Sequence, residues 1–110
     1  MLRLRSSRDF RRAYRRGRVV GQRLLVLYCS RNGSRATRVG ITVSKKVGKA
    51  HARNLVKRRL REAIRRFDLA PGYDLVVVAK PAASDAQYQD LVHALSDALG
   101  RAGVQQRKPQ

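Results

Sequence analysis

The chain has 110 residues, of which 26 are Lys or Arg and only 7 are Asp or Glu, so its formal net charge is +19. This length suits a single domain with a modest core and excludes a second domain. It contains no run near the ~18 apolar residues of a membrane span, no apolar signal region, and only one cysteine, Cys29, which excludes an intramolecular disulfide framework. We therefore expect a cytoplasmic protein with a phosphate-rich partner and no membrane association.

The first element expected along the chain is a short helix over residues 7–16. Ser6 is a typical N-cap residue, Asp9 favours the same helix end, and Gly17 is a typical stop. The other faces of this helix are basic. A brief strand is expected at residues 19–20.

Two longer strands are expected next. In residues 22–30 apolar side chains fall on both faces, which indicates a strand covered on both sides. The Asn-Gly dipeptide at residues 32–33 is a turn signal. Residues 38–43 then return as a second strand, and we expect the two strands to form a pair.

The second half of the chain continues with a helix over residues 50–67 and a loop at Pro71-Gly72. Residues 75–79 form a continuous apolar run, which predicts a buried strand. Together with a final helix described below, the order of elements is α-β-β-β-α-β-α. This order predicts an α/β two-layer sandwich with a small four-stranded mixed sheet.

Ser84 and Gln87 have the spacing of a capping box at the start of a final amphipathic helix. Gly100 or Gly103 is expected to end that helix. We expect residues 1–103 to form the domain and residues 104–110 to be a disordered polar tail.

The helix over residues 50–67 has two contrasting sides on a helical wheel. The apolar side, expected to pack on the sheet, consists of Ala52, Val56, Leu60, Ala63, Ile64 and Phe67. The opposite side carries one row formed by Arg53, Lys57 and Arg61, and a second formed by Asn54, Arg58 and Arg65. Like charges four residues apart destabilise an isolated helix by about 0.2–0.5 kcal/mol per pair. Folding alone therefore does not explain these rows, which indicate a surface for a polyanion.

The uneven distribution of charge supports this interpretation. Residues 1–67 hold 22 of the 26 basic residues and two of the acids, whereas residues 68–110 carry a net charge of −1. A solvated charged face is the alternative, but such faces usually mix signs, and Glu62 is the one acid on this helix. Leu55 lies among the charges, either as an isolated surface leucine or as a contact for a partner.

The spacing of these residues carries a family resemblance. The segment Lys45-Lys46-x-Gly48-x-Ala50-x-x-Arg53-Asn54-x-x-Lys57-Arg58-x-x-Arg61-Glu62 resembles the signature of the bacterial ribonuclease P protein subunit. Flanking features agree with it, namely Asp9-Phe10 with Gly17, Arg38-Val39-Gly40, Gly72-x-Asp74 and Lys80-Pro81. The resemblance spans about residues 2–103. One departure is Leu55, at the third position of a motif that the family usually has as Arg-Asn-Arg.

The resemblance implies a subunit of an endoribonuclease, a hydrolase whose chemistry is carried by RNA. Ribonuclease P cleaves precursor tRNA to remove the 5′ leader, and its RNA and substrate hold the Mg²⁺ cofactor. The protein binds the ribonuclease P RNA and the leader, and no protein partner is required. The family also implies a left-handed βαβ crossover around the basic helix, against the usual right-handed preference.

Site residues follow from the resemblance by position. Those expected to contact the catalytic RNA are Lys45, Lys46, Lys49, Arg53, Asn54, Lys57, Arg58 and Arg61. Those expected to line the leader-binding groove are Phe10, Tyr14, Tyr28 and Thr42. Aromatic side chains beside a basic track suit single-stranded nucleotides. Phe10 is equally compatible with a place in the core.

Other chemistries have little support in the sequence. His51 and His93 lack Cys, His or carboxylate neighbours at ligand spacing, so no metal site and no catalytic side chains are expected. A structural ribosomal protein would share the size and charge, but this alternative does not explain the ordered set of motif residues. A membrane-active or DNA-compacting basic protein disagrees with the globular α/β pattern and the nearly neutral C-terminal third.

Overall fold

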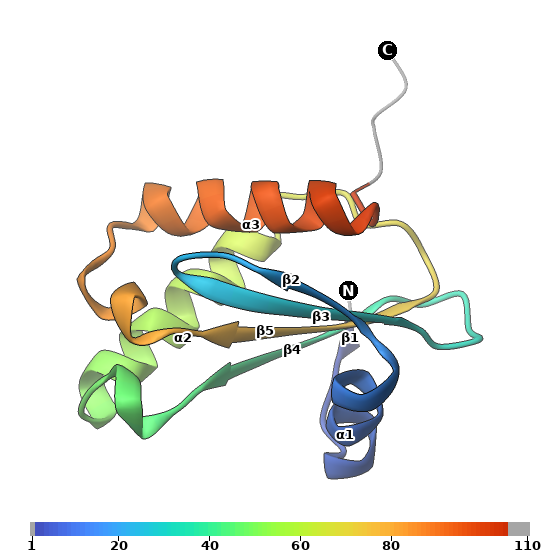
Figure 1. The fold of residues 1–110 in the computed structure, drawn as a ribbon, viewed down its shortest axis with the longest axis horizontal. Helices are drawn as coiled ribbons and strands as arrows, with labels where there is room; N and C mark the ends of the chain where they lie inside the picture. Colours follow the sequence, from blue (N-terminus) through green and yellow to red (C-terminus); the bar gives the residue numbers. More distant parts are fainter. Residues whose placement is uncertain (1, 106–110) are drawn as a thin grey trace.

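Five strands form one mixed sheet, with three α-helices packed around it (Figure 1). The structure is a computed structural model, and it describes residues 2–105. The strands are β1 (Leu2–Arg3), β2 (Arg18–Gly21), β3 (Leu25–Arg31), β4 (Arg38–Val43) and β5 (Tyr73–Ala79). The helices are α1 (Ser7–Arg16), α2 (Ala50–Ile64) and α3 (Tyr88–Ala102), with short 3₁₀ turns η1 (Lys45–Val47) and η2 (Pro81–Asp85).

The strand order β1-β4-β5-β3-β2 corrects the expected pairing of the two longer strands. β5 lies between β3 and β4, antiparallel to the first and parallel to the second. The reason is burial. Leu75, Val76 and Val77 are fully buried, and only the central position covers both faces of such a strand. The Asn-Gly turn therefore belongs to a longer loop, in which the Asn32 amide donates to the carbonyl of Ala36 at 2.8 Å.

Alternate side chains of the sheet point to two different layers. Leu75 and Val77 of β5 join the main core with α2 and α3, whereas Val76 lies in a smaller core on the α1 side. On β3, Val26 and Tyr28 remain half-buried because α1 covers only part of their face. The expectation that this strand is covered on both sides is therefore only partly correct, and an open area of sheet is left beside α1.

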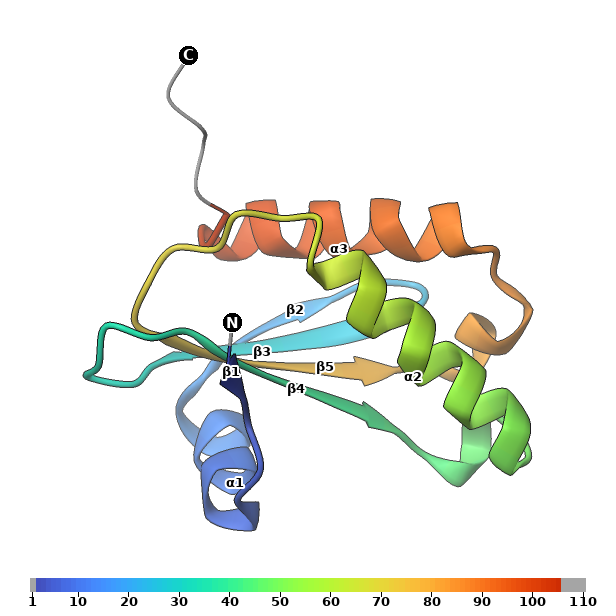
Figure 2. The ribbon, with the colours of Figure 1, turned by 180° about the vertical axis from the view of Figure 1, so that it is seen from behind.

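The chain connects the parallel neighbours β4 and β5 through α2, which lies across one face of the sheet (Figure 2). In Figure 1 both strands point to the left, β5 lies above β4, and α2 passes behind the sheet. A connection with this geometry is a left-handed crossover. This confirms the family expectation. The hand of the crossover places the basic side of α2 next to the β4 edge.

Several element boundaries differ from those expected. α2 ends at Ile64 because Arg66 and Phe67 donate to carbonyls only three residues earlier, which tightens the last turn; the Phe67 side chain still packs on the core. The capping box of α3 is formed by Gln87 and Asp90. Ser84 instead lies in η2, where its hydroxyl donates to the carbonyl of Pro81 at 3.0 Å.

The two ends of the described chain hold more structure than the sequence indicates. β1 is a fifth strand that the sequence analysis missed, since two residues carry no periodicity; its pairing depends on the open edge of β4. Val104 is fully buried and Gln105 forms a bridge with Leu69, so the ordered chain passes the expected boundary at residue 103. The rest of the expected tail, 106–110, lies outside the described residues. Between residues 2 and 105, no helix is both long and apolar enough to cross a bilayer.

Candidate nucleic-acid interface

The basic side of α2 is presented outward because its apolar side is held in the core. Val56, Leu60, Ala63 and Ile64 are buried, as the helical wheel predicts. Asn54, Lys57 and Arg58 are exposed, whereas Arg53 and Arg61 are half-buried at the edge of the helix. Leu55 is half-buried as well.

The cations on this side of α2 have no acidic counterpart. Within residues 2–105, the side chains of Arg53, Lys57, Arg58 and Arg61 make no hydrogen bond or ion pair with the protein, and the Arg53 Nε is buried without a partner. Burial, together with the nearby Arg3 and Arg65, lowers the pKa of Arg61. A surface of unpaired arginines is electrostatically unfavourable by itself and is stabilised by a bound polyanion.

The connector before α2 extends this surface. Val47 in η1 is buried and anchors the turn, which leaves Lys45 and Lys46 exposed. Lys49 is the N-cap of α2, where its carbonyl accepts a hydrogen bond from the Arg53 N–H at 2.9 Å and its side chain is exposed. The structure therefore brings all eight residues expected to contact the catalytic RNA onto α2 and the connector that precedes it.

The four residues expected to line a leader groove also come together, on the open face of the sheet beside α1. The rings of Tyr14 and Tyr28 meet edge to face, with centroids 4.8 Å apart and planes at 80°. The Tyr14 hydroxyl lies 3.5 Å from the Thr42 Oγ1 on β4. Tyr14 is 39% exposed, so its ring is available for stacking.

Phe10 is placed differently from the two tyrosines. Its ring is half-buried in the smaller core with Leu4 and Ala13, and lies so close to Gly40 that an added Cβ there would be 2.5 Å from the ring. Phe10 therefore forms the inner wall of this region and orients α1, while Tyr14 and Tyr28 supply its accessible aromatic surface.

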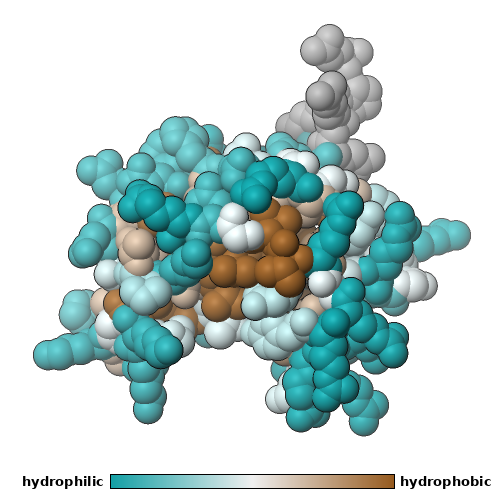
Figure 3. All heavy atoms as spheres, viewed as in Figure 1, coloured by the Kyte–Doolittle hydropathy of each residue, from teal (hydrophilic) through white to brown (hydrophobic). Residues whose placement is uncertain are grey.

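The open face also contains apolar residues that the sequence analysis missed. Strand register places Val19 opposite Tyr28, and Val26 opposite Val78. Val19 is 58% exposed. Figure 3, which views the side of the sheet opposite to α2, shows an apolar patch in the centre bordered by hydrophilic side chains. The alternation of side chains in residues 22–30 contained a signal for Val26, but only the pairing of strands brings the other two valines beside it.

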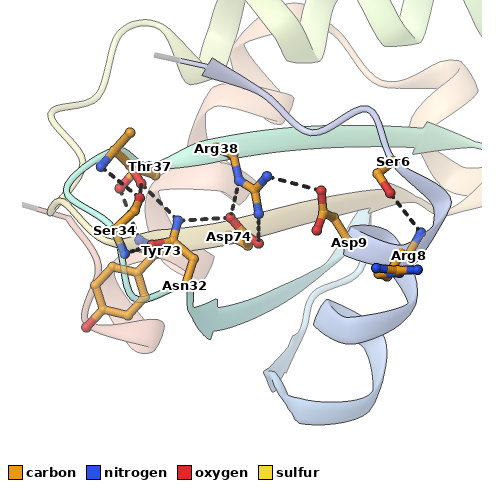
Figure 4. A network of polar contacts seen from close by, with 10 residues as sticks. Ser6, Arg8, Asp9, Asn32, Ser34, Thr37, Arg38, Tyr73 and Asp74 are labelled. Atoms are coloured by element: carbon orange, nitrogen blue, oxygen red, sulfur yellow. Dashed lines mark hydrogen bonds and ion pairs between the residues drawn. The ribbon is translucent and has the colours of Figure 1, made fainter.

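A polar network fixes α1 against the sheet (Figure 4). Arg38 donates from Nη2 and Nε to the two oxygens of Asp74, at 2.7 and 2.9 Å, and from Nη1 to Asp9 of α1 at 3.1 Å. Asn32 also donates to Asp74, at 3.0 Å. Burial opposes ionisation of Asp74, but the hydrogen bonds from Arg38 and Asn32 outweigh it, so the pKa of Asp74 is lowered. The network sets the position of α1 and of its tyrosine.

The two histidines lie on α2 and α3. His93 lies on α3, with its Nε2 3.4 Å from the Nε2 of Gln89, and His51 is exposed at the start of α2. In residues 2–105, no group of three or more His, Cys, Asp or Glu side chains could hold a metal ion. The geometry therefore supplies two chemically different surfaces: one with cations at successive turns of α2 and one with aromatic and apolar side chains.

Comparisons with known proteins find relatives over nearly the whole chain. A family model described as ribonuclease P matches residues 1–103. The ribonuclease P protein component of Clostridium botulinum strain Loch Maree is 43% identical over 104 residues, covering 92% of this chain and 94% of that protein. The corresponding protein of Clostridioides difficile strain 630 is 39% identical over 104 residues, with coverage of 92% and 91%.

Solved structures show the same architecture. The RNase P protein of Staphylococcus aureus superposes with a TM-score of 0.85 at 33% identity, covering 94% of this chain and 97% of that one. The RNase P protein of Thermotoga maritima gives a TM-score of 0.82 at 32% identity, with coverage of 92% and 97%. Sequence and fold agree over nearly the whole chain, which therefore belongs to the bacterial ribonuclease P protein family.

Proposed function

We propose that this chain is the protein subunit of ribonuclease P, in which α2 and its connector bind the catalytic RNA and the open sheet face beside α1 binds the 5′ leader of precursor tRNA. Family membership assigns the enzyme and the reaction, the endonucleolytic release of the leader. The assignment of the catalytic RNA and the leader to separate sites is based on one observation. Among the described residues there are two chemically different surfaces, one formed by unpaired cations and one by tyrosines beside apolar side chains.

Each surface suits one state of RNA. Guanidinium and ammonium groups at successive turns of α2 match a phosphate backbone, and their binding depends strongly on salt because counterions are released. The Tyr14–Tyr28 pair lies on the open sheet face beside α1, where unstacked bases of a single strand can pack on the exposed Tyr14 ring. A precursor tRNA differs from the mature tRNA by its leader, so a site for unpaired nucleotides distinguishes substrate from product.

The chemistry would then be carried by the RNA. We expect Mg²⁺ to be held mainly by the RNA subunit and the substrate, and to supply the activated water of phosphodiester hydrolysis. The protein's part is to add positive charge near those phosphates and to position the leader. We further expect the complex to act in the cytoplasm with no second protein.

Reconstitution tests this function. Adding the purified protein to the matching catalytic RNA at low Mg²⁺ should raise the rate of precursor tRNA cleavage at the leader junction. Arg58→Ala should weaken binding to the catalytic RNA and reduce the slope of log affinity against log salt by about 0.7–0.9, the loss of one phosphate contact.

The matched control is Arg35→Ala, which removes the same charge from an exposed position in the β3–β4 loop. It should leave the slope unchanged. If Arg58→Ala and Arg35→Ala changed the slope equally, the α2 arginines would act only through net charge. Recovery of ribosomal subunits without any ribonuclease P RNA in a pull-down would contradict the function itself and favour a ribosomal protein.

A further inference from the structure

A groove lies between β1, the outer edge of β4 and α2. It shares Lys57 and Arg61 with the surface assigned to the catalytic RNA, whereas its cations on the β1 side have no role in the function described above. It has a volume of about 650 Å³, within the range of pockets that hold small ligands. Its apolar floor includes Val39, Ile41 and Ile64, and its rim carries cations from two distant parts of the chain. These rim residues are Arg3, Arg5, Lys57, Arg61 and Arg65.

The charged residues that line this groove are all cationic. No Asp or Glu lines it, and within the described residues the side chains of Arg3, Arg61 and Arg65 form no ion pair. Arg61 is half-buried and Arg3 and Arg65 lie near enough to repel it, which lowers the pKa of Arg61. Three arginines brought together by folding, without a carboxylate, are the arrangement that binds an anionic oxygen group.

The sheet edge adds a second feature of this groove. β1 pairs with β4 only at Arg38 and Val39, so the backbone of β4 from Gly40 to Val43 has no strand on its outer side. Ile41 therefore offers an apolar side chain and an open strand edge beside the arginines. A ligand with a phosphate next to a less polar ring, such as a nucleotide within a chain, satisfies both features.

We propose that this groove binds a backbone phosphate of the catalytic RNA, held by Arg3 and Arg65 on either side of Arg61, so that the RNA contact continues from α2 around the β4 edge to β1. The inference rests on the proposed function, since it requires that the protein bind this RNA. It adds two residues, Arg3 and Arg65, which lie at opposite ends of the sequence segment that carries the basic charge. An extended acidic peptide on the β4 edge is the competing ligand.

The double variant Arg3→Gln/Arg65→Gln tests the groove. Both side chains are exposed, so the fold should survive, which a thermal melt checks. Binding to the catalytic RNA should weaken, and the log–log salt slope should fall by about 1.4–1.8, the loss of two phosphate contacts. The matched control is Arg23→Gln/Arg35→Gln, which removes the same charge from two exposed loop positions outside the groove and should keep the wild-type slope.

The outcomes separate this inference from the proposed function. If wild-type protein failed to bind the catalytic RNA, the proposed function would be wrong. If wild-type protein bound and both double variants kept its slope, or lost the same amount, only the groove inference would be overturned. Binding of an oligo-glutamate peptide that Arg3→Gln/Arg65→Gln abolishes, with an unchanged RNA slope, would assign the groove to an acidic peptide and also overturn it.

A positional experiment identifies the RNA that enters the groove. Cys29 is buried, so an iron–EDTA label can be placed selectively on Leu2→Cys at the rim, where Leu2 is 56% exposed. Radical cleavage should fall on the catalytic RNA, and a label on Ser96→Cys, exposed on α3, should not cut there. Cleavage confined to the precursor tRNA leader would overturn the assignment to the catalytic RNA.

Discussion

At the scale of single residues, the Arg38–Asp74 pair connects the sheet to α1. Asp74 is 1% exposed, and Arg38 bonds both of its oxygens while also reaching Asp9. A two-pronged ion pair of this kind is specific in geometry. Neutralising Asp74 removes the buried member of this pair and leaves Arg38 with its contact to Asp9, which is more costly than losing an exposed pair.

Asp74→Asn should therefore lower the free energy of unfolding by roughly 1.5–3 kcal/mol, the usual contribution of a hydrogen bond to a charged group, measured in urea. It should also change the pH dependence. Because the folded-state pKa of Asp74 is lowered, its stabilisation is complete above about pH 5 and is lost as the pH falls below the ordinary Asp value of about 3.9. The variant should lose less stability than wild type over that acidic range.

The matched control for this pair is Asp97→Asn. Asp97 accepts a bond from Arg101 at 3.1 Å at the surface, where both side chains are largely exposed. Its loss should change stability little, because solvent screens the pair. Equal destabilisation by the two variants would show that burial of Asp74 is not what makes its pair important.

Tyr14 is the residue on which leader recognition depends most directly. Tyr14→Ala should weaken binding of precursor tRNA by about 1–3 kcal/mol, the contribution of one base stacked on an aromatic ring, and should leave mature tRNA binding unchanged. Tyr14→Phe keeps the ring and loses only the 3.5 Å contact with Thr42, so it should behave like wild type. Equal losses on precursor and mature tRNA would reject the leader groove.

At the scale of elements, the close approach of α1 to β4 determines the shape of the open face. The Phe10 ring occupies the space that a side chain at position 40 would fill. A glycine is needed there for lack of room, while the backbone itself is an ordinary strand. The glycine thereby allows α1 to lie against the sheet and to hold Tyr14 beside Tyr28.

Gly40→Ala should displace Phe10 and destabilise the protein by about 1–3 kcal/mol, the usual cost of overpacking. Gly21→Ala on β2 is the matched control, since no atom lies within 4 Å of an added Cβ there, and it should be nearly neutral. The penalty of Gly40→Ala should shrink in a Phe10→Leu background, as a urea double-mutant cycle would show. An undiminished penalty would mean that the strain lies elsewhere.

At the scale of the whole molecule, the end of the chain completes the main core. Val104 is fully buried after α3, and its carbonyl accepts a hydrogen bond from the Ala70 N–H at 2.7 Å. Gly103, with a φ of 73°, turns the chain back toward the loop that follows α2. This return closes the loop that follows α2 against the end of α3.

Truncation tests that boundary. A chain ending at Gln105, the last residue that the structure describes, is the reference. One ending at Gly103 should lose about 1.5–3 kcal/mol, the value of burying one valine side chain, measured by urea unfolding. If the shorter chain were as stable as the longer one, the domain would end at residue 103, as the sequence alone suggests.

Much of the fold and site could be predicted from the sequence because the signals are local. The apolar side of α2, the limits of α1 and β4, and the basic rows around Arg53 and Arg58 follow from periodicity, caps and charge within one segment. The sequence could not decide whether Phe10 belongs to the core or to the leader-binding groove. The position of its ring depends on the absence of a side chain at Gly40, which lies in a different element.

By itself, the sequence determined the helices, the longer strands, the family and the segment that carries the positive charge, because each depends on neighbours within a few residues. Only the tertiary structure decided that β5 lies between β3 and β4, that Val19 and Val78 flank Tyr28 and Val26 on the open face, and that Arg3 lies beside Arg61 and Arg65. These contacts join residues far apart in the chain. Strand order and the hand of the crossover set these contacts. The apolar run of β5 predicts a buried strand, but no local pattern encodes which strands lie on either side of it.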